Sequence, residues 1–409
     1  MVAAAKPPDE KSGRRFGDFN MNKITIGMIG AGRAAELHSA SYALVPLPLR
    51  LKTIAARRVS QLEPACKRFG FERFTIDIDD IINDPEIDVV DICTPPYVHA
   101  DMIIQALRAG KHVICEKPLT GYFGLAGDEM PIGERVSKRK MYESVLSQLE
   151  ILGEAVRTSG KKLMYAENFV YAPAVIKAGE IVHAKKSRIL FMKGEESLKG
   201  SSSAVAGRWD KTGGGIFKRN GVHPIGAMLW LKQQEAAARG VEIKIKSIVG
   251  DMGYAVGTLN KYEHRHIAAQ PVDVEDSGTA VITFDDGTKA AVIATDNLLG
   301  GSKNCVELYC NDAAINCRLT MNDAMETYLL DEDGMDDVHL SEMLPVKTGW
   351  NRPFIADEVL RGYVNEMNDF MHCVYFDTEP RSGFALAADT ARVVYAAYYS
   401  AESGRRVDF

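Results

Sequence analysis

The sequence predicts an α/β fold: a doubly wound parallel sheet in the N-terminal part, followed by an α+β domain with a mainly antiparallel sheet. Short apolar runs alternate with helical segments as far as about residue 168. A glycine turn joins the first run to the first helix, and beyond residue 168 the apolar runs become longer and are joined by hairpin signals. We therefore expect a flexible tail over 1–20, a first domain over 21–168 and a second over 169–409.

The alternation in the first domain gives each element its predicted place. Apolar, strand-like runs cover 24–29, 49–55, 89–93, 112–115 and 162–166. Helical segments cover 33–42, 61–69, 97–109 and 141–158. The segment 121–140 holds four glycines, one proline and many charges. It reads as a long loop, either functional or a solvated insertion.

The second domain shows a different texture. Residues 275–284 and 288–294 flank an Asp-Asp-Gly turn, which predicts a β-hairpin. The runs 306–309 and 314–319 suggest further antiparallel strands, and a helix over 385–401 closes the chain. One face of the antiparallel sheet should pack on the helices of its own domain, and the other face should pair with another subunit. We therefore expect a homodimer or homotetramer.

Composition restricts the class of protein. The chain has 409 residues, of which 46% are hydrophobic and 25% charged, with a net charge of −6. This mild acidity argues against nucleic acid or an anionic membrane as the main partner. The first 20 residues hold no apolar leader, and no stretch offers the ~20 uninterrupted apolar residues of a membrane span. The seven cysteines lack CxxC spacing, so we expect reduced core thiols, no metal and a cytoplasmic location.

The sequence Gly30-Ala31-Gly32-Arg33-Ala34-Ala35 matches GxGxxA between the first strand and the first helix. Gly30 permits a tight turn, Gly32 leaves room for a pyrophosphate, and Ala35 lets the helix pack closely on the strand. The first backbone N–H groups of the helix, from Arg33 and Ala34 onward, are free to bind phosphate oxygens. The sequence therefore predicts a Rossmann domain that binds NAD or NADP.

The end of the second strand bears on the choice of cofactor. A site that prefers NAD usually carries Asp or Glu there, on the ribose 2′-hydroxyl. Between Ser39 and Leu62 this chain has no acidic residue, and Arg57 and Arg58 follow the strand instead. A guanidinium can pair with a 2′-phosphate, so we expect NADP in preference to NAD; solvated arginines are the alternative.

Two further motifs carry candidate chemistry. Glu116-Lys117-Pro118 ends a parallel strand, at the edge where open α/β sheets bind ligands. Farther along, Trp209, the triplet Gly213-Gly214-Gly215 and the sequence Gly221-Val222-His223 form a second cluster.

With these motifs the chain resembles the glucose–fructose oxidoreductase / inositol dehydrogenase / rhizopine-catabolism (Gfo/Idh/MocA) family from about Lys23 to the C-terminus. The motifs that carry the resemblance are the GxGxxA turn, Thr94-Pro95-Pro96 with His99, Glu116-Lys117-Pro118, Asn168-Phe169-Val170-Tyr171-Ala172-Pro173, and the glycine triplet with His223. The resemblance implies a Rossmann domain, a C-terminal domain with a large open sheet, and pyridine-nucleotide chemistry on sugars, cyclitols or related compounds.

The resemblance also assigns roles to residues. Thr94, Pro95, Pro96, His99 and Glu116 are expected beside the cofactor. The Lys117–Pro118 bond is commonly cis in such proteins, which would aim Lys117 at the nicotinamide and the substrate oxygen. His223 is expected to be the acid/base. Substrate contacts are expected from Trp209, Asn168, Tyr171 and Glu195, with at most one of Glu195 and Glu196 facing the pocket because neighbours on a strand point opposite ways.

The chain departs from the sugar dehydrogenase pattern at two positions. Arg219 stands where Asp usually precedes the histidine by four residues, and Gly226 stands where a further Asp is common. An arginine cannot accept a proton, but it can hold a carboxylate through two parallel bonds. We therefore expect a small-molecule substrate that is anionic, such as a sugar acid. The alternative is that Arg219 turns outward or pairs with Glu195 or Glu196.

The leading hypothesis from the sequence is an NAD(P)-dependent dehydrogenase or reductase that transfers a hydride to or from a sugar, a polyol or a sugar acid. A cofactor-binding sensor without catalysis is the first rival, and the missing Asp favours it. An NAD-dependent glycoside-cleaving enzyme of the same family is the second rival.

Overall fold

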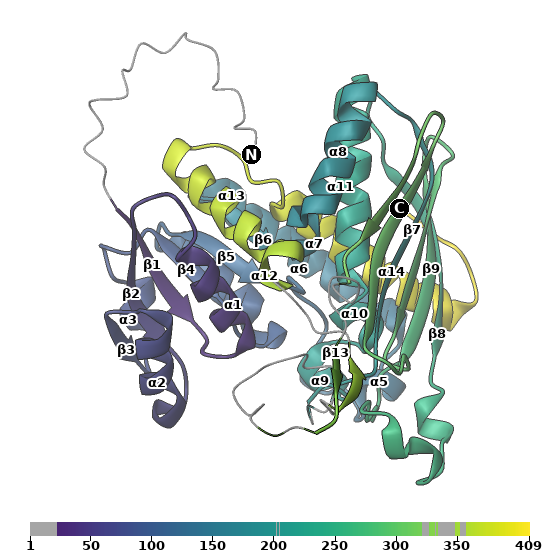
Figure 1. Cartoon of the computed structure of the whole chain (residues 1–409), viewed down its shortest axis with the longest axis horizontal. Coiled ribbons are helices and arrows are strands. Elements are labelled where there is room, and N and C mark those ends of the chain that lie inside the picture. The colour runs from purple at the N-terminus through teal and green to yellow at the C-terminus, as the bar shows by residue number, and fades with distance from the viewer. Residues whose placement is uncertain are drawn as a thin grey trace.

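The structure is a computed structural model that describes residues 23–201, 203, 205–320, 327–331, 333, 348–351 and 357–409. The predicted tail over 1–20 lies outside these residues. Two sheets dominate the fold, one in each half of the chain, with helices packed around and between them (Figure 1).

The first sheet is parallel throughout and has the strand order β3-β2-β1-β4-β5-β6. Its strands are β1 (Ile24–Ile29), β2 (Leu49–Ala55), β3 (Arg73–Thr75), β4 (Val89–Ile92), β5 (His112–Glu116) and β6 (Leu163–Ala166). The order reverses between β1 and β4, so the crevice for a ligand is expected at the carboxyl ends of these strands. The predicted doubly wound sheet is confirmed. The three-residue strand β3 was not predicted.

Helices connect these parallel strands. They are α1 (Arg33–Tyr42), α2 (Val59–Phe69), α3 (Asp79–Ile82), the 3₁₀ turn η1 (Pro96–Val98), α4 (His99–Arg108), α5 (Ile132–Arg135) and α6 (Lys138–Ser159). The bounds of α1 agree with the prediction because a glycine turn precedes it and Pro46 and Pro48 follow closely. Helix α6 begins three residues earlier than predicted, because the side chain of Ser137 caps it by accepting the N–H of Lys140.

The second sheet has the strand order β12-β11-β7-β10-β9-β8-β15. Its strands are β7 (Ile189–Leu198), β8 (Ile245–Gly253), β9 (Ser277–Phe284), β10 (Lys289–Thr295), β11 (Ser302–Cys310), β12 (Ala314–Arg318) and β15 (Val407–Asp408). All neighbouring pairs are antiparallel except β7 with β10. The predicted hairpin is confirmed as β9 and β10. A small hairpin, β13 (Thr327–Leu329) with β14 (Gly349–Asn351), stands apart.

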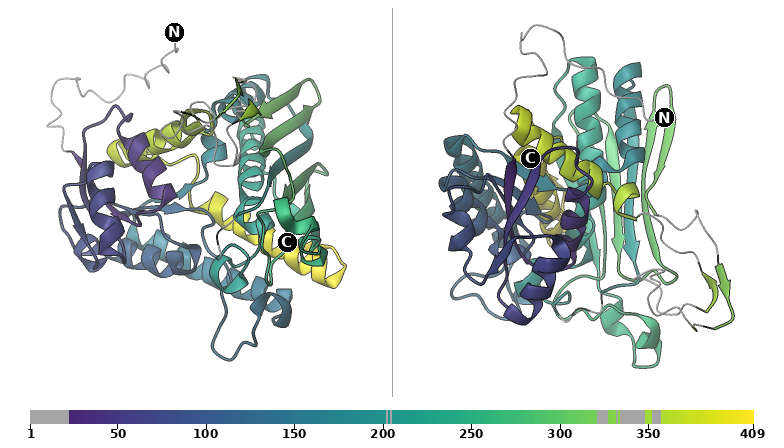
Figure 2. Two further views of the ribbon diagram at one scale, coloured as in Figure 1. Left: turned by 60° about the horizontal axis from the view of Figure 1, so that its bottom comes forward. Right: turned by 60° about the vertical axis from the view of Figure 1, so that its left-hand side comes forward.

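Helices cover one face of this second sheet (Figure 2). The helices of this half are α7 (Asn168–Tyr171), α8 (Pro173–Lys185), α9 (Trp209–Thr212), α10 (Ile216–Arg219), α11 (Val222–Arg239), α12 (Asp357–Leu360), α13 (Tyr363–Phe376) and α14 (Phe384–Ser403); η2 (Val256–Thr258) and η3 (Glu263–His266) are short 3₁₀ turns. Helix α11 packs on both α8 and β7, which explains why most of its side chains are buried.

The last two long helices join the two halves. Helix α13 packs against α1 of the first domain, and α14 packs against α6 as well as β8 (Figure 1). The sequence prediction assigned all of 169–409 to the second domain. The structure instead shows that the end of the chain returns to the first, because the apolar faces of α13 and α14 meet α1 and α6.

The segment 121–140 is packed against the second domain. Tyr122 accepts the indole N–H of Trp209 at 3.1 Å, and the N–H of Gly133 donates to Asp273 at 3.0 Å. Tyr122 is buried, so a solvated insertion is the wrong interpretation for this part. The segment holds the α9 region in place beside the first domain.

The seven cysteines are all free thiols. None of the described helices combines the length and the hydropathy that a membrane span requires.

Candidate active site

The glycine turn between β1 and α1 fits a dinucleotide. Gly30 has φ of +122°, and a Cβ there would lie 2.3 Å from the carbonyl oxygen of Cys93. A Cβ on Gly32, in contrast, would meet no atom within 4 Å. No side chain caps the N-terminus of α1, so its first N–H groups face this open space. The turn therefore offers free N–H donors and room for the cofactor pyrophosphate.

Two loops beside this turn are held together by His99. Its Nδ1 lies 3.0 Å from the carbonyl oxygen of Pro118, and its Nε2 lies 2.9 Å from that of Thr94. Burial lowers the pKa of His99, which favours the neutral ring. His99 thus joins the loop after β4, which carries Pro95 and Pro96, to the loop after β5.

The end of β2 is basic and open. Arg57 and Arg58 are exposed, and neither has an ion-pair partner within the described part of the chain. Arg33, at the start of α1, forms an exposed ion pair with Glu36 at 3.1 Å.

Lys117 reaches from the first domain to the second. It follows β5, and its peptide bond to Pro118 is cis, as the resemblance implied. Its Nζ donates a hydrogen bond to the backbone oxygen of Arg219 at 2.9 Å. The carboxylate of Glu116 accepts the backbone N–H of Lys117 at 2.9 Å, which turns the glutamate back toward its own strand.

A buried glutamate fixes the loop that carries the glycine triplet. Glu275 accepts the N–H groups of Gly215 at 2.8 Å and of Phe217 at 2.9 Å. A Cβ on Gly215 would lie 1.9 Å from the backbone oxygen of Glu275, so no larger residue fits there. The sequence analysis did not identify Glu275. The triplet serves this close backbone contact, which places α10 and the start of α11.

His223 lies in the first turn of α11 and is 1% exposed. Its ring stacks on Phe169 with the centroids 4.8 Å apart. Its Nδ1 is 2.6 Å from a carboxylate oxygen of Glu167, and its Nε2 is 3.9 Å from one of Glu196. The Nε2 edge is therefore outside hydrogen-bond range of Glu196.

Burial sets the protonation of this pair. Desolvation lowers the pKa of His223 well below its ordinary value, and the positive charges of Lys117 and Arg361 lower it further. Desolvation also raises the pKa of Glu167 well above its ordinary value, against the opposing charge of Lys117. A neutral imidazole follows, which can accept a proton.

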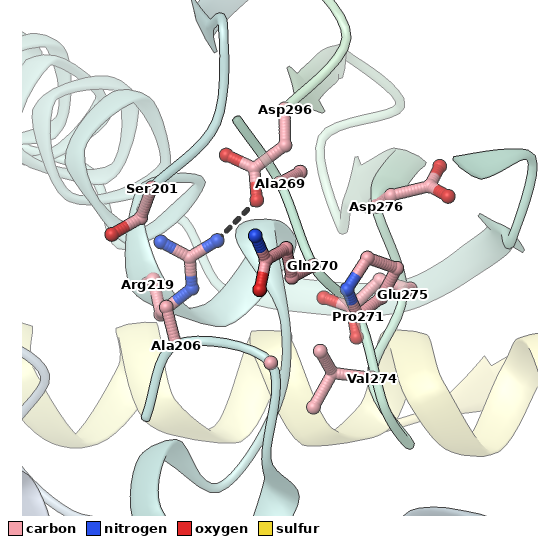
Figure 3. A pocket seen from close by; sticks show the side chains of 11 residues that line it. Ser201, Ala206, Arg219, Ala269, Gln270, Pro271, Val274, Glu275, Asp276 and Asp296 are labelled. Carbon is pink, nitrogen blue, oxygen red and sulfur yellow. Dashed lines mark hydrogen bonds and ion pairs between the residues drawn. The ribbon is translucent and has the colours of Figure 1, made fainter. Parts of the chain in front are cut away.

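Arg219 borders a small hollow beside the glycine loop. The hollow has a volume of about 10 Å³ and is lined by residues of several loops and strand ends, among them Arg219, Gln270 and Asp296 (Figure 3). The guanidinium of Arg219 forms an ion pair with Asp296 (Figure 3). The pairing with Glu195 or Glu196 that the sequence left open is not what the structure has. Neither Nε of Arg219 nor Oδ1 of Asp296 has a hydrogen-bond partner among the described residues.

Glu196, and not the predicted Glu195, faces His223. Glu195 points to the other side of β7, where it forms an ion pair with Lys303 at 2.7 Å. Glu196 accepts a hydrogen bond from Asn220 at 3.1 Å, on the side of the sheet that packs on α11. The expectation that only one of the two points inward is confirmed, but the choice of Glu195 is corrected.

Three other residues expected to touch substrate are buried away from the hollow. Trp209 is 0% exposed and its indole N–H is bonded to Tyr122. The side-chain amide of Asn168 donates to the backbone oxygen of Arg361 at 2.8 Å. The hydroxyl of Tyr171 donates to Asp369 at 3.0 Å. Their polar atoms fix α7, α9 and α13, and none of the three residues lines the hollow beside Arg219.

The sequence analysis missed two carboxylates that border the site. Glu167 comes directly after β6 and Asp296 directly after β10. The rule that identified Lys117, which looks for polar residues at the carboxyl ends of parallel strands, applies equally to Glu167. Asp296 gave no such signal, because only folding brings the end of β10 to Arg219.

Comparison with known proteins identifies the family of the chain. Residues 24–126 match the family model "Oxidoreductase family, NAD-binding Rossmann fold", and residues 169–316 match the "GFO/IDH/MocA C-terminal domain". Levoglucosan dehydrogenase of Pseudarthrobacter phenanthrenivorans is 32% identical over 297 residues, which are 68% of this chain and 69% of that protein. The uncharacterized oxidoreductase YrbE of Bacillus subtilis is 29% identical over 67% of this chain and 74% of its own length.

Solved structures show the same fold. GenD2 from gentamicin A biosynthesis, in complex with NAD, has a TM-score of 0.75 at 20% identity and covers 96% of this chain and 98% of its own. A levoglucosan dehydrogenase in complex with NADH and levoglucosan has a TM-score of 0.69 at 22% identity, covering 95% and 99% of the two chains. The protein therefore belongs to the Gfo/Idh/MocA oxidoreductase family, with an NAD-binding Rossmann domain followed by the C-terminal domain of that family.

Proposed function

We propose that this protein is an NAD(P)-dependent dehydrogenase or reductase of a neutral polyhydroxylated small molecule, a sugar or a cyclitol. The observation that carries the proposal is the meeting of Lys117, from the first domain, with the Arg219–His223 segment of the second. This meeting lies at the carboxyl edge of the parallel sheet, the edge that also carries the glycine turn. Open α/β sheets bind their ligands at that edge.

The reaction requires two transfers, a hydride between the substrate carbon and the nicotinamide and a proton to or from the substrate oxygen. A bound nicotinamide supplies the acceptor or donor of the hydride. The ammonium of Lys117 is placed to donate a hydrogen bond to the reacting substrate oxygen and to stabilise negative charge on it. His223 is neutral and its Nε2 has no hydrogen-bond partner in the described residues, so it can take the hydroxyl proton during oxidation and return it during reduction.

The charge around Arg219 favours a neutral substrate. Asp296 balances the guanidinium charge, so a substrate carboxylate would have to displace this ion pair. The unpartnered Nε of Arg219 and Oδ1 of Asp296 instead form a donor–acceptor pair that suits sugar hydroxyls. Some relatives have names of this class, levoglucosan dehydrogenase and myo-inositol 2-dehydrogenase. We therefore replace the anionic substrate expected from sequence with a neutral one.

The cofactor proposal keeps NADP in preference to NAD. The exposed Arg57 and Arg58, with no carboxylate at the end of β2, support binding of a 2′-phosphate. The similar structures with NAD or NADH bound show that the fold accepts NAD, so the two cofactors must be compared directly.

A panel of neutral sugars, cyclitols and sugar acids, followed at the NAD(P)H absorbance, tests the proposal. We expect turnover of at least one neutral member, and a fall of about 10²-fold or more in kcat for Lys117→Ala and for His223→Ala, with cofactor binding retained. Cofactor binding with no turnover across the panel would support a sensor instead. Glycoside cleavage without net nucleotide turnover would support the second rival.

Asp296→Asn tests the neutral pocket separately. Without its counter-charge, Arg219 becomes a half-buried cation with no ion-pair partner. We expect kcat/KM for the neutral substrate to fall and any activity on the corresponding acid to rise. Wild-type enzyme that prefers the acid would contradict the proposed neutrality.

We also propose that a second copy of the chain covers the open face of the second sheet. Val249 and Val281 are paired across β8 and β9, and Phe191 and Tyr309 across β7 and β11; all four are partly exposed on this face. Sedimentation analysis is expected to show a homodimer or homotetramer for the wild type and a monomer for Val281→Glu.

We also propose a cytoplasmic location, with which the free cysteines agree.

A further inference from the structure

We propose that Glu167 is the positioning residue of His223, that it holds the histidine proton on Nδ1, and that Gly226 is a glycine because Glu167 fills the space beside it. Only the kinetic test below depends on the proposed function. The carboxylate comes from the end of β6 in the first domain, whereas His223 and Gly226 lie one turn apart on α11.

The contacts of Glu167 support this role. Its side chain is 0% exposed, and Oε1 lies 2.6 Å from Nδ1 of His223. The same oxygen accepts the backbone N–H of Phe169 at 3.3 Å, which fixes the carboxylate on its own backbone. The other oxygen has no hydrogen-bond partner among the described residues. The carboxylate is thus oriented toward the histidine.

Gly226 explains why the carboxylate fits. A Cβ on residue 226 would lie 2.8 Å from Cγ of Glu167, 3.3 Å from its carboxyl carbon and 3.5 Å from Oε2. Real Cβ atoms do not approach carbon so closely, so Glu167 and a side chain at 226 compete for one space. The two departures from the sugar dehydrogenase pattern, at Arg219 and Gly226, are therefore compensated by a carboxylate from another part of the chain.

The consequence for His223 follows from its two ring nitrogens. A carboxylate at Nδ1 accepts that N–H, which leaves Nε2 with the free electron pair. That tautomer can accept the proton of a substrate hydroxyl, and the hydrogen bond from Nδ1 to Oε1 of Glu167 then holds the imidazolium in place. Without the carboxylate the ring has no reason to keep its proton on Nδ1.

Nitrogen NMR of histidine-labelled protein tests the tautomer without any substrate. His223 is assigned by comparison with His223→Asn. We expect the wild-type ring to be protonated on Nδ1, and Glu167→Gln to move a large part of that population to Nε2. Glu154→Gln, an exposed carboxylate paired with Arg157 on α6, serves as the matched control and should change nothing at His223. A wild-type ring protonated only on Nε2 would overturn the proposal.

Kinetics test whether Glu167 and a side chain at position 226 compete for the same space beside His223. We expect kcat for alcohol oxidation to fall about 10- to 100-fold in Glu167→Gln, with KM for the cofactor unchanged and the rise of the rate with pH altered. Gly226→Ala should show the same loss, because it displaces Glu167. In Glu167→Ala with Gly226→Asp, a carboxylate returns to the vacated space and at least part of the rate should recover.

The outcomes separate this inference from the proposed function. Wild type without turnover on any substrate defeats the proposed function, and the NMR result still decides the role of Glu167. Wild type with turnover that Glu167→Gln leaves intact in both kcat and pH profile defeats the inference alone. Folding of each variant is followed by circular dichroism and thermal unfolding, so that a misfolded protein is not counted as either result.

Discussion

The two glycines of the cofactor turn, Gly30 and Gly32, differ in the space around them, so replacing each with Ala should have a different effect. In Gly32→Ala the new methyl group meets no protein atom within 4 Å, so the free energy of unfolding should fall by less than about 1 kcal/mol, the usual cost of Ala at an N-cap. In Gly30→Ala the new Cβ would lie 2.3 Å from the oxygen of Cys93, at φ of +122°. Overlap and backbone strain together should cost about 2–4 kcal/mol.

Gly32→Ala, which should hardly change the stability, should weaken cofactor binding strongly. The methyl group in Gly32→Ala occupies the space in front of α1, where it would push the pyrophosphate off the helix N–H groups. Loss of one charged hydrogen bond is worth about 1.5–3 kcal/mol, so the dissociation constant should rise about 10- to 100-fold. The assays are urea unfolding of the apoprotein and a fluorescence titration with NADH and NADPH. Normal affinity in a stable Gly32→Ala protein would refute the placement of the pyrophosphate at this turn.

Three further predictions concern other parts of the molecule. Replacing Arg57 and Arg58 with Ser should reduce kcat/KM for NADP about tenfold or more and leave NAD nearly unchanged, as measured by cofactor saturation; equal losses for both would mean that neither arginine reads the 2′-phosphate. Trp209→Phe should cost about 2–4 kcal/mol in urea unfolding, since it leaves the buried oxygen of Tyr122 without its donor, while KM for substrate stays the same. Burial lowers the pKa of Lys218 to about 7, so the folded state binds fewer protons than the unfolded one between pH 7 and the ordinary lysine value of 10.5, and stability gains with rising pH. Lys218→Met should remove up to about 5 kcal/mol of this rise and should be more stable than wild type below pH 7; parallel pH curves for the two proteins would exclude the effect.

Sequence patterns predicted the first domain well because its signals are local. A glycine turn and apolar runs of strand length each depend on neighbours in the chain, and the bounds of β1, α1 and β2 agree with the prediction. Short elements such as β3 and α3 were missed, since a run of three or four residues carries too little periodicity to identify it.

The candidate site was only partly predictable. Lys117 and His223 stood in recognisable motifs, and the structure brings their segments together. Trp209 and Tyr171 stood in equally recognisable motifs, but their polar atoms bond to partners that are distant in sequence and buried. A motif records that a residue is constrained, and packing constrains a residue as strongly as catalysis does.

The sequence by itself determined the class of fold, the turn for a dinucleotide, and the strand end that carries Lys117, because these follow from backbone geometry and residue order over a few turns of chain. Only the tertiary structure decided which charges meet. Asp296 neutralises Arg219 from 77 residues away, and Glu167 reaches His223 across 56. The charge of a pocket and the tautomer of a histidine depend on groups within a few ångströms, and the order of residues does not state which groups those are.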